Sequence, residues 1–294
     1  MLSPSSTEQT RSRPLLGTFV TIRAAAADAA AASRAIEAAF AAIARTQASM
    51  SFHDPNSELS VLNREAHNHR VPVSEDLFAV LSLARRIHDA SDGAFDVAIA
   101  PELVRWKYLP RHGRMSGGGT FENVELDPAR TVRFAVPLLI DLGGIAKGYA
   151  VDRAVDALRD AGIRRGVVNA GGDLRVFGDQ SELVHVRHPQ APGTCVPIAE
   201  LRDGSIATSA PYFSKRRVQG REVTPIVDPA ARAACTSSRS VSVIAPTCVI
   251  ADALTKVVAL RGVRSVPVLD RFDASALILN ADGAVAIGGS TRAA

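Results

Sequence analysis

A glycine turn followed by an expected helix, at residues 141–152, is the first segment whose residue types suggest chemistry. Its sequence is DLGGIAKGYAVD, in which Gly143 and Gly144 let the chain turn tightly between strand and helix. The free N–H groups at a helix N-terminus favour an anion such as a phosphate, and Lys147 adds a cation in the first turn. Asp141 can accept hydrogen bonds from a base edge or a ribose. The alternative is a simple strand-to-helix turn that requires glycine.

A second glycine turn follows shortly after the first. It lies in VVNAGGD (167–173), where Asn169 and Asp173 bracket the two glycines. Two such turns with polar neighbours are compatible with binding a phosphorylated ligand, but the segment is equally compatible with a β-hairpin closed by an ordinary glycine turn.

The expected helix 247–261 carries polar groups suited to a metal. Four aliphatic residues share one of its faces: Ile250, Leu254, Val257 and Val258. Asp252, Thr255 and Lys256 fall on the opposite side, where a carboxylate and a hydroxyl one turn later supply hard oxygen ligands for Mg²⁺. The alternative is a solvent-exposed face with an Asp252–Lys256 ion pair, worth a few tenths of a kcal/mol.

Other familiar signatures are absent from the sequence. His67 and His69 lie in a polar loop in which nothing completes a metal-binding set, so they are expected at the surface. The three cysteines form no C-x-x-C pair, which argues against a zinc site or a disulfide framework. The sequence contains no G-x-S-x-G elbow, Walker loop or Rossmann G-x-G-x-x-G motif.

Composition narrows the possible partners. The formal net charge is +4, but the arginines and lysines are scattered, so no nucleic-acid partner is expected. No stretch reaches the length of a membrane span without charged residues, so no span is expected. Because neither a signal peptide nor a lipid-acceptor cysteine is recognisable at the N-terminus, the expected location is the cytoplasm.

The elements alternate irregularly between strand and helix patterns, which favours an α+β fold over a doubly wound sheet. Residues 1–13 are polar and predicted to be a disordered tail, and residues 14–294 to form a single domain. The expected elements are a strand at 15–24, a helix capped by Asp28, a short helix within 50–66, a helix from Ser74 to Gly93, a loop at 109–120, short strands at 121–140, a helix closed by Gly162, a hairpin at 166–178, a mostly β region at 182–245 and paired strands at 263–288.

The ordered series of motifs resembles the ApbE-type FAD:protein FMN transferases. The matching segments are LLGTFVTI, SFHDPNSELSVLN, DGAFDVAIAPELVRW, IDLGGIAKGYAVD, VVNAGGDLRVFG, SIATS, IVDP and SVSVIAPTCVIADALTKVV. They run from about Leu15 to Gly262 and continue weakly to Gly288, so they cover most of the chain. The resemblance implies a single α+β domain, related to the T-fold, with mixed or antiparallel sheets, flanking helices and FAD in a cleft.

The resemblance also implies the residues of the site. Those expected against FAD are Leu16, His53, Ala94, Phe95, Asp96, Asp141, Lys147 and Ile226, with His53 standing where a tyrosine is more usual. The implied Mg²⁺ ligands are the backbone carbonyl of Gly144, the carboxylate of Asp252 and the hydroxyl of Thr255.

Two positions depart from the pattern of the family. Lys256 stands where a threonine is usual, and Thr255 lies one residue early. A protonated ammonium cannot ligate Mg²⁺, but it could replace part of the metal's charge beside a pyrophosphate. In addition, Thr224 and Pro225 precede Ile226, where the family usually has a histidine.

The implied reaction is attack by a Thr or Ser hydroxyl of a client flavoprotein on the FMN phosphorus of FAD, with AMP leaving. Mg²⁺ held by Asp252 would stabilise the leaving group, Lys256 would lie beside it, and Asp252 or Asp228 would help to deprotonate the hydroxyl. The alternatives are a non-catalytic FAD-binding protein, a Mg²⁺-dependent FAD pyrophosphatase that uses water, and an unrelated binding module.

Overall fold

The computed structural model describes residues 7–112, 118–188, 191–210, 214–280 and 283–288. Its centre is an eight-stranded sheet in which every neighbouring pair is antiparallel. In sheet order the strands are β1 (Thr7–Leu15), β2 (Thr18–Ala26), β6 (Gly166–Ala170), β7 (Asp173–Phe177), β10 (Ser205–Ser209), β15 (Ser240–Ala245), β16 (Ser275–Asn280) and β17 (Gly283–Ile287). Antiparallel strands together with separate helices confirm the predicted α+β class.

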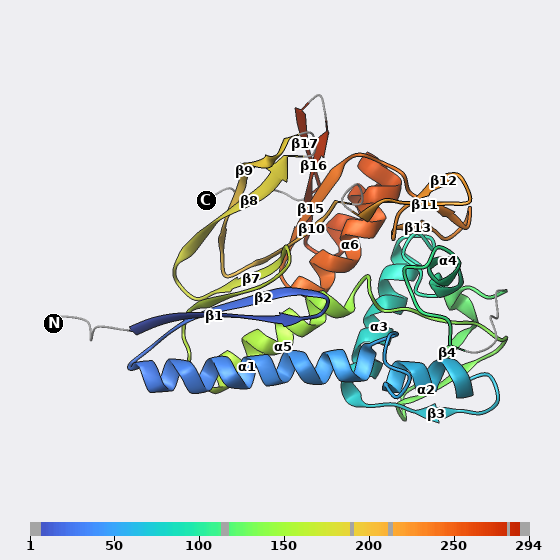
Figure 1. Cartoon of the computed structure of the whole chain (residues 1–294), viewed down its shortest axis with the longest axis horizontal. Coiled ribbons are helices and arrows are strands. Elements are labelled where there is room, and N and C mark those ends of the chain that lie inside the picture. Colours follow the sequence, from blue (N-terminus) through green and yellow to red (C-terminus); the bar gives the residue numbers. More distant parts are fainter. Residues whose placement is uncertain (1–6, 113–117, 189–190, 211–213, 281–282, 289–294) are drawn as a thin grey trace.

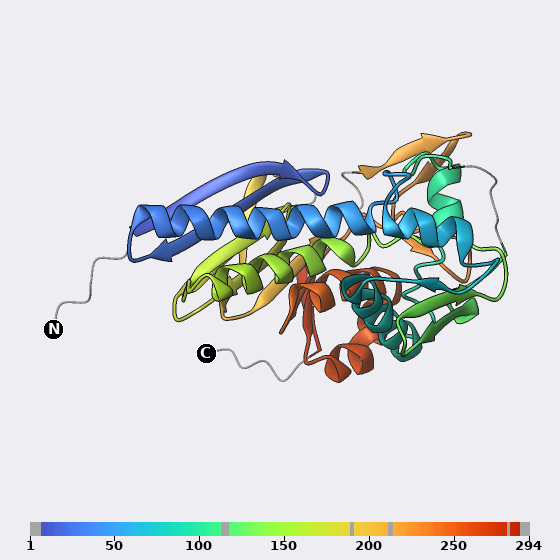
Figure 2. The same cartoon turned by 90° about the horizontal axis from the view of Figure 1, so that it is seen from below.

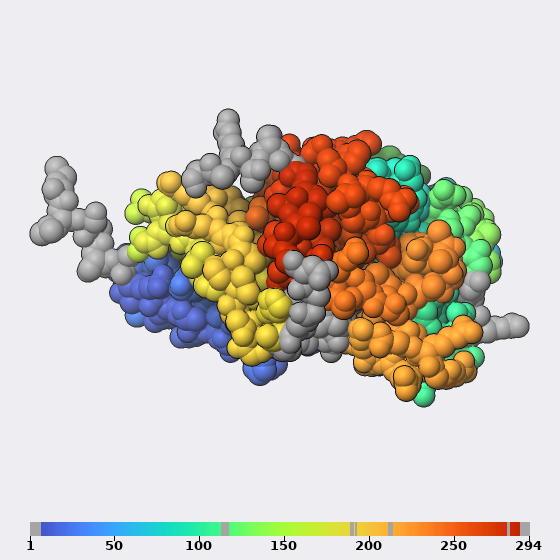
Figure 3. Space-filling model, turned by 90° about the horizontal axis from the view of Figure 1, so that it is seen from above, coloured from blue at the N-terminus to red at the C-terminus, as the bar shows by residue number. Residues whose placement is uncertain are grey.

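Three helices lie against this sheet: α1 (Ala29–Met50), α5 (Ala146–Asp160) and α6 (Cys248–Arg261). Figure 2, seen from below, shows α1 and α5 running side by side in front of the strands. On the opposite face lies a hairpin of β8 (Ser181–His188) and β9 (Ala191–Arg202), which is yellow in Figure 3. An apolar cluster that includes Leu174, Val184 and Ile206 fills the space between this hairpin and the sheet.

Most of the remaining elements gather at one end of the molecule, on the right of Figure 1. They are α2 (Glu58–Glu65), α3 (Glu75–Ala90), α4 (Ala100–Arg105), a sheet of β3 (Val71–Pro72), β5 (Thr131–Phe134) and β4 (Val124–Asp127) after a 3₁₀ turn (Phe121–Asn123), and two small hairpins, β11 (Arg216–Val218) with β12 (Arg221–Val223) and β13 (Val227–Asp228) with β14 (Ala233–Ala234). One apolar cluster joins α2 and α3 to α6, so this end shares a core with the large sheet.

Helix starts were predictable because their caps are local. The side chains of Asp28 and Ser74 accept hydrogen bonds from the N–H groups of Ala31 (2.7 Å) and Leu77 (3.2 Å), as N-caps do. The turn after α5 uses Gly162 at a φ of 81°, a conformation that favours glycine.

Two predictions about the chain ends need correction. Residues 7–13 are not a disordered tail, because all of β1 pairs with β2 and Arg11 and Arg13 bind Glu37 of α1 at 2.9 and 2.5 Å. An exposed edge strand needs few apolar residues, so β1 shows no apolar pattern from which it could be predicted. Residues 1–6 lie outside the described part of the chain. Within the described residues of 263–288, the predicted paired strands are β16 and β17, but a 3₁₀ turn (Gly262–Ser265) and α7 (Val266–Arg271) come before them, with proline in the first helical turn.

Among the residues described, no helix combines the length and the apolarity needed to cross a bilayer. The loop expected at 109–120 lies partly outside the described residues, at 113–117.

Candidate functional site

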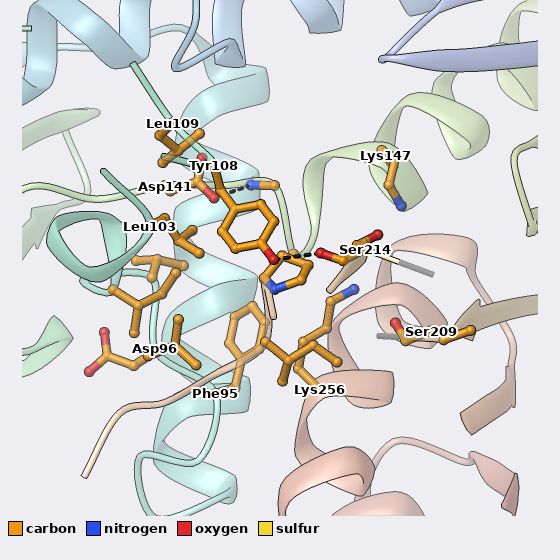
Figure 4. A pocket seen from close by; sticks show the side chains of 18 of the residues that line it. Phe95, Asp96, Leu103, Tyr108, Leu109, Asp141, Lys147, Ser209, Ser214 and Lys256 are labelled. Atoms are coloured by element: carbon orange, nitrogen blue, oxygen red, sulfur yellow. Dashed lines mark hydrogen bonds between the residues drawn. The ribbon is translucent and has the colours of Figure 1, made fainter. Parts of the chain in front are cut away.

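A cavity of about 510 Å³ opens where α5 and α6 meet the end of the molecule that contains α3 and α4. Its apolar wall comes from the segment after α3 and from the end of α4: Ala94, Phe95, Val97, Ile99, Leu103, Tyr108 and Leu109, with Ile226 and Val227. Its polar side comes from the first glycine turn, the first turn of α5, the end of β10 and the middle of α6: Asp141, Gly143, Gly144, Lys147, Thr208, Ser209 and Lys256. Figure 4 shows Lys147 and Lys256 extending into the same side of the cavity.

Two ammonium groups and two buried carboxylates form an ion cluster on the polar side. Lys147 Nζ donates to Asp173 Oδ2 and lies 3.9 Å from Asp252 Oδ1. Lys256 Nζ donates to the same Asp252 Oδ1 and to the Asp252 carbonyl at 2.9 Å. The side chains of Asp173 and Asp252 are 3% and 1% exposed, so the lysines are their main charge partners.

The cluster fixes the ionisation of its members. Burial alone would raise the pKa of Asp252, but the Lys147 and Lys256 ammonium groups outweigh it and hold this pKa below its ordinary value. Burial would lower the pKa of Lys147, but Asp173 and Asp252 raise it above its ordinary value. Burial, helped by Asp252, raises the pKa of Asp173. Asp252 and Lys147 are therefore a charged pair at neutral pH.

The crossing of α5 and α6 places the two lysines. The Gly148 N–H on α5 donates to Asp252 Oδ2 on α6 at 3.1 Å. In return, Asp152 on α5 accepts from the Cys248 and Val249 N–H groups that begin α6, at 3.0 and 2.8 Å. A carboxylate from each helix thus satisfies backbone groups of the other, and the two helices are held in one register.

The alternative interpretation of α6, a solvent-exposed polar face, is wrong. Asp252 and Thr255 are 1% and 0% exposed, and α6 is buried on nearly all sides between the sheet, α3 and α5. The Asp252–Lys256 pair exists, but it is part of the buried cluster at the cavity and not a surface contact.

The residues present do not fit the Mg²⁺ site that the resemblance implies. Both carboxylate oxygens of Asp252 already accept hydrogen bonds, and Thr255 Oγ1 donates to the Asp252 carbonyl at 2.7 Å and contacts Ser209 Oγ at 2.8 Å. A divalent ion about 4 Å from the Lys256 ammonium would be repelled by ~8 kcal/mol at an effective dielectric constant of about 20. Within the described part of the chain, no three His, Cys, Asp or Glu side chains form a metal-binding group.

The structure brings most of the other predicted residues to the cavity. Its lining includes Ala94, Phe95, Asp96, Asp141, Gly144, Lys147, Ile226 and Lys256. The Asp96 carboxylate accepts from the Ala98 and Phe121 N–H groups at 2.6 and 3.1 Å, so it stabilises the loop that carries Phe95. Asp252 and Thr255 lie behind Lys256 and do not line the cavity.

Three further predicted residues are not brought to the lining. Leu16 lies in the turn between β1 and β2, where its N–H donates to Gln47 at 2.6 Å. His53 is exposed and is not among the residues that line the cavity. Asp228 accepts from the Ala230 and Ala231 N–H groups at 3.0 and 3.1 Å, as a turn-forming carboxylate does.

Some lining residues were missed from the sequence. Tyr108 lies in the cavity, with its hydroxyl donating to the carbonyls of Ser214 and Val223, the latter at 3.0 Å. Lys107 just before it has a φ of 63°, a chain reversal that no local motif indicates. Thr208 and Ser209 belong to the SIATS motif, which could have pointed to them.

Thr224, which precedes the segment before which the family usually has a histidine, has a structural role here. Thr224 is fully buried, and its hydroxyl donates to the Cys235 carbonyl at 2.7 Å. It also accepts from the Ile226 N–H at 3.3 Å, which fixes the turn that presents Pro225 and Ile226 to the cavity.

Solved structures share this overall fold. The ApbE protein of Thermotoga maritima superimposes with a TM-score of 0.84, at 27% identity and over 97% of both chains. The flavin transferase ApbE of Vibrio cholerae gives a TM-score of 0.78 at 23% identity, over 97% of this chain and 98% of the other, and so shows the same fold. The predicted single α+β fold is therefore confirmed.

The sequence model of the ApbE family matches residues 16–278, and this chain belongs to that family. An FAD:protein FMN transferase of Vibrio cholerae serotype O1 is 28% identical over 222 residues, which are 70% of this chain and 66% of the relative. Another, of Treponema pallidum, is 27% identical over 278 residues, 84% of this chain and 77% of the relative.

Proposed function

We propose that this protein is an FAD:protein FMN transferase, which moves FMN from FAD onto a Thr or Ser hydroxyl of a client flavoprotein and releases AMP. The observation that carries the proposal is the cavity itself, which joins an apolar wall to a side with two ammonium groups. The relatives that bear this name support it.

The two parts of the cavity match the two parts of the ligand. Phe95, Tyr108 and Ile226 offer apolar surface for a flavin ring. Lys147 and Lys256 offer charge for a pyrophosphate. The N-terminus of α5, which has no side-chain cap, adds its partial positive charge at Gly144.

The transfer needs positioning and charge stabilisation more than covalent help from the protein. The client's hydroxyl oxygen forms a bond to the FMN phosphorus, and the bond from that phosphorus to the AMP oxygen breaks. Lys147 and Lys256 stabilise the negative charge that develops on the phosphates. The hydroxyl proton must pass to a base.

Asp141 is the carboxylate that we assign as this base. Asp252 is already bound by two ammonium groups, and Asp228 does not line the cavity. Asp141 lines it, accepts from the Gly143 N–H at 3.0 Å, and has its pKa raised by burial to about 6. A base with this pKa is largely deprotonated at neutral pH and still able to accept a proton.

The transfer rate should therefore rise as the pH increases through about 6, because Asp141 accepts a proton only in its carboxylate form. Asp141→Asn is expected to lower kcat about a hundredfold and to remove this inflection, while FAD affinity changes little. Rates of AMP release from pH 5 to 8 for both proteins test the assignment. An unchanged inflection in the variant would count against Asp141 as the base.

We expect the protein to bind FAD at least tenfold more tightly than FMN, because FMN lacks the pyrophosphate and AMP that the lysine side of the cavity would hold. Titration calorimetry with each flavin measures this ratio. Equal or tighter binding of FMN would contradict the assignment of the two lysines to the pyrophosphate.

Incubation with FAD and an acceptor flavoprotein domain distinguishes the proposed function from its alternatives. Flavin fluorescence that stays on the denatured acceptor, with one AMP released for each flavin attached, identifies a transferase. Free FMN and AMP without labelled acceptor identify a pyrophosphatase. FAD that remains bound and intact identifies a carrier.

A further inference from the structure

We propose that the Lys256 ammonium takes the place of the divalent cation in this chain, so that FAD is bound and its FMN transferred without Mg²⁺. The inference rests on the proposed function and assigns a specific property to the same site. The contacts that the implied metal ligands make in the structure disagree with a metal site.

Lys256 lies between two of the implied metal ligands. Its Nζ donates to both the carboxylate and the carbonyl of Asp252. Its Cε lies 3.4 Å from the point where a Cβ on Gly144 would stand, so the end of its stem packs on the other ligand. The side chain thus fills the space between Gly144 and Asp252 that a shared metal ion would need.

The third implied metal ligand, Thr255, also makes contacts other than those of a metal ligand. Thr255 is fully buried, and its hydroxyl bonds the Asp252 carbonyl and Ser209. The residue four positions after Asp252, one helical turn away on the same side, is the lysine. Where a threonine would present an oxygen at this place, the chain presents a cation.

The charges agree with this exchange. In formal charges, Lys147 and Lys256 balance Asp173 and Asp252, so the cluster has no formal net charge before a ligand binds. Without Lys256 the cluster would carry one net negative charge, and it would repel a pyrophosphate unless a metal ion were added. The lysine supplies permanently a charge that a metal ion would otherwise bring.

The ammonium is also accessible to a ligand. The Lys256 side chain is 20% exposed and lines the cavity, although Asp252 anchors it from behind. Figure 4 shows its nitrogen directed to the same side as that of Lys147. One group can therefore hold Asp252 and still bind a phosphate oxygen, since an ammonium has three donors.

The test compares FAD affinity in EDTA and in excess MgCl₂ for the wild type, Lys256→Thr and Lys256→Met, by quenching of flavin fluorescence. Wild-type affinity should be the same in both buffers. Lys256→Thr should lose about ten- to a hundredfold in EDTA and regain it with Mg²⁺. Lys256→Met, which keeps a similar stem but offers no oxygen, should lose as much and recover less. Lys215→Thr removes a lysine outside the lining and should match wild type.

Mn²⁺ gives a second, direct readout by electron paramagnetic resonance. The wild-type complex with FAD should leave Mn²⁺ free, and the Lys256→Thr complex should bind one ion. Wild-type affinity that falls in EDTA, or Mn²⁺ bound to the wild-type complex, would overturn the inference and leave the proposed function standing. Absence of FAD binding in both buffers would overturn the proposed function and the inference with it. The wild-type measurements decide even if a variant fails to fold.

Discussion

Asp252→Ala is expected to reduce transfer about a thousandfold and to lower the free energy of unfolding by about 3–5 kcal/mol. The substitution removes the partner of Lys256, leaves Lys147 with Asp173 alone, and leaves the buried Gly148 N–H without its acceptor. Both effects have one cause, because the same carboxylate places the lysines and joins α5 to α6. The measurements are AMP release with saturating FAD and acceptor, and urea unfolding followed by circular dichroism.

Asp228→Ala is the matched control. It removes an aspartate that caps a turn and does not line the cavity, so transfer should stay within a few-fold of wild type. If Asp252→Ala retained wild-type transfer, the ion cluster would have no part in catalysis. If it retained wild-type stability, the contact between Asp252 and Gly148 would not join the helices as the structure indicates.

Gly148→Val is expected to destabilise the protein by about 3 kcal/mol or more and to abolish FAD binding. A Cβ at this position would stand 2.3 Å from the Cys248 carbonyl oxygen and 2.8 Å from Asp252 Cβ. Because the first of these contacts is with backbone, no side-chain rotation relieves it, and α5 and α6 must separate. Separation breaks the bonds from each helix to the carboxylate of the other. Urea unfolding and fluorescence titration with FAD measure the two effects.

Gly144→Ala provides the control for this substitution. A Cβ at Gly144 would meet Lys256 Cε at 3.4 Å, the end of a flexible side chain that can shift. Its unfolding free energy should therefore stay within about 1 kcal/mol of wild type. A Gly148→Val protein as stable as this control would show that the helix crossing tolerates expansion.

Local features of the fold could be predicted from the amino-acid sequence. The caps at Asp28 and Ser74, the glycine that ends α5 and the glycine turn before it all act on neighbouring backbone groups, so short segments are sufficient to predict them. The same holds for the hairpin of β6 and β7. The series of motifs was sufficient to identify the family and to predict most of the residues that line the cavity, because the order of motifs is a property of the sequence.

Which of these residues act together, and in what ionisation state, depends on the tertiary structure. Helical periodicity placed Asp252 on a polar face, but α6 has neighbours on nearly all sides, and so that face became a buried ion cluster. The partner of Lys147 is Asp173, which comes from the second glycine turn, and strand β1 exists because β2 supplies its hydrogen bonds. Burial and pairing depend on what other parts of the chain bring to a residue. For that reason, the sequence could show that Lys256 departs from the family pattern. Its place at the implied metal position results from the crossing of α5 and α6.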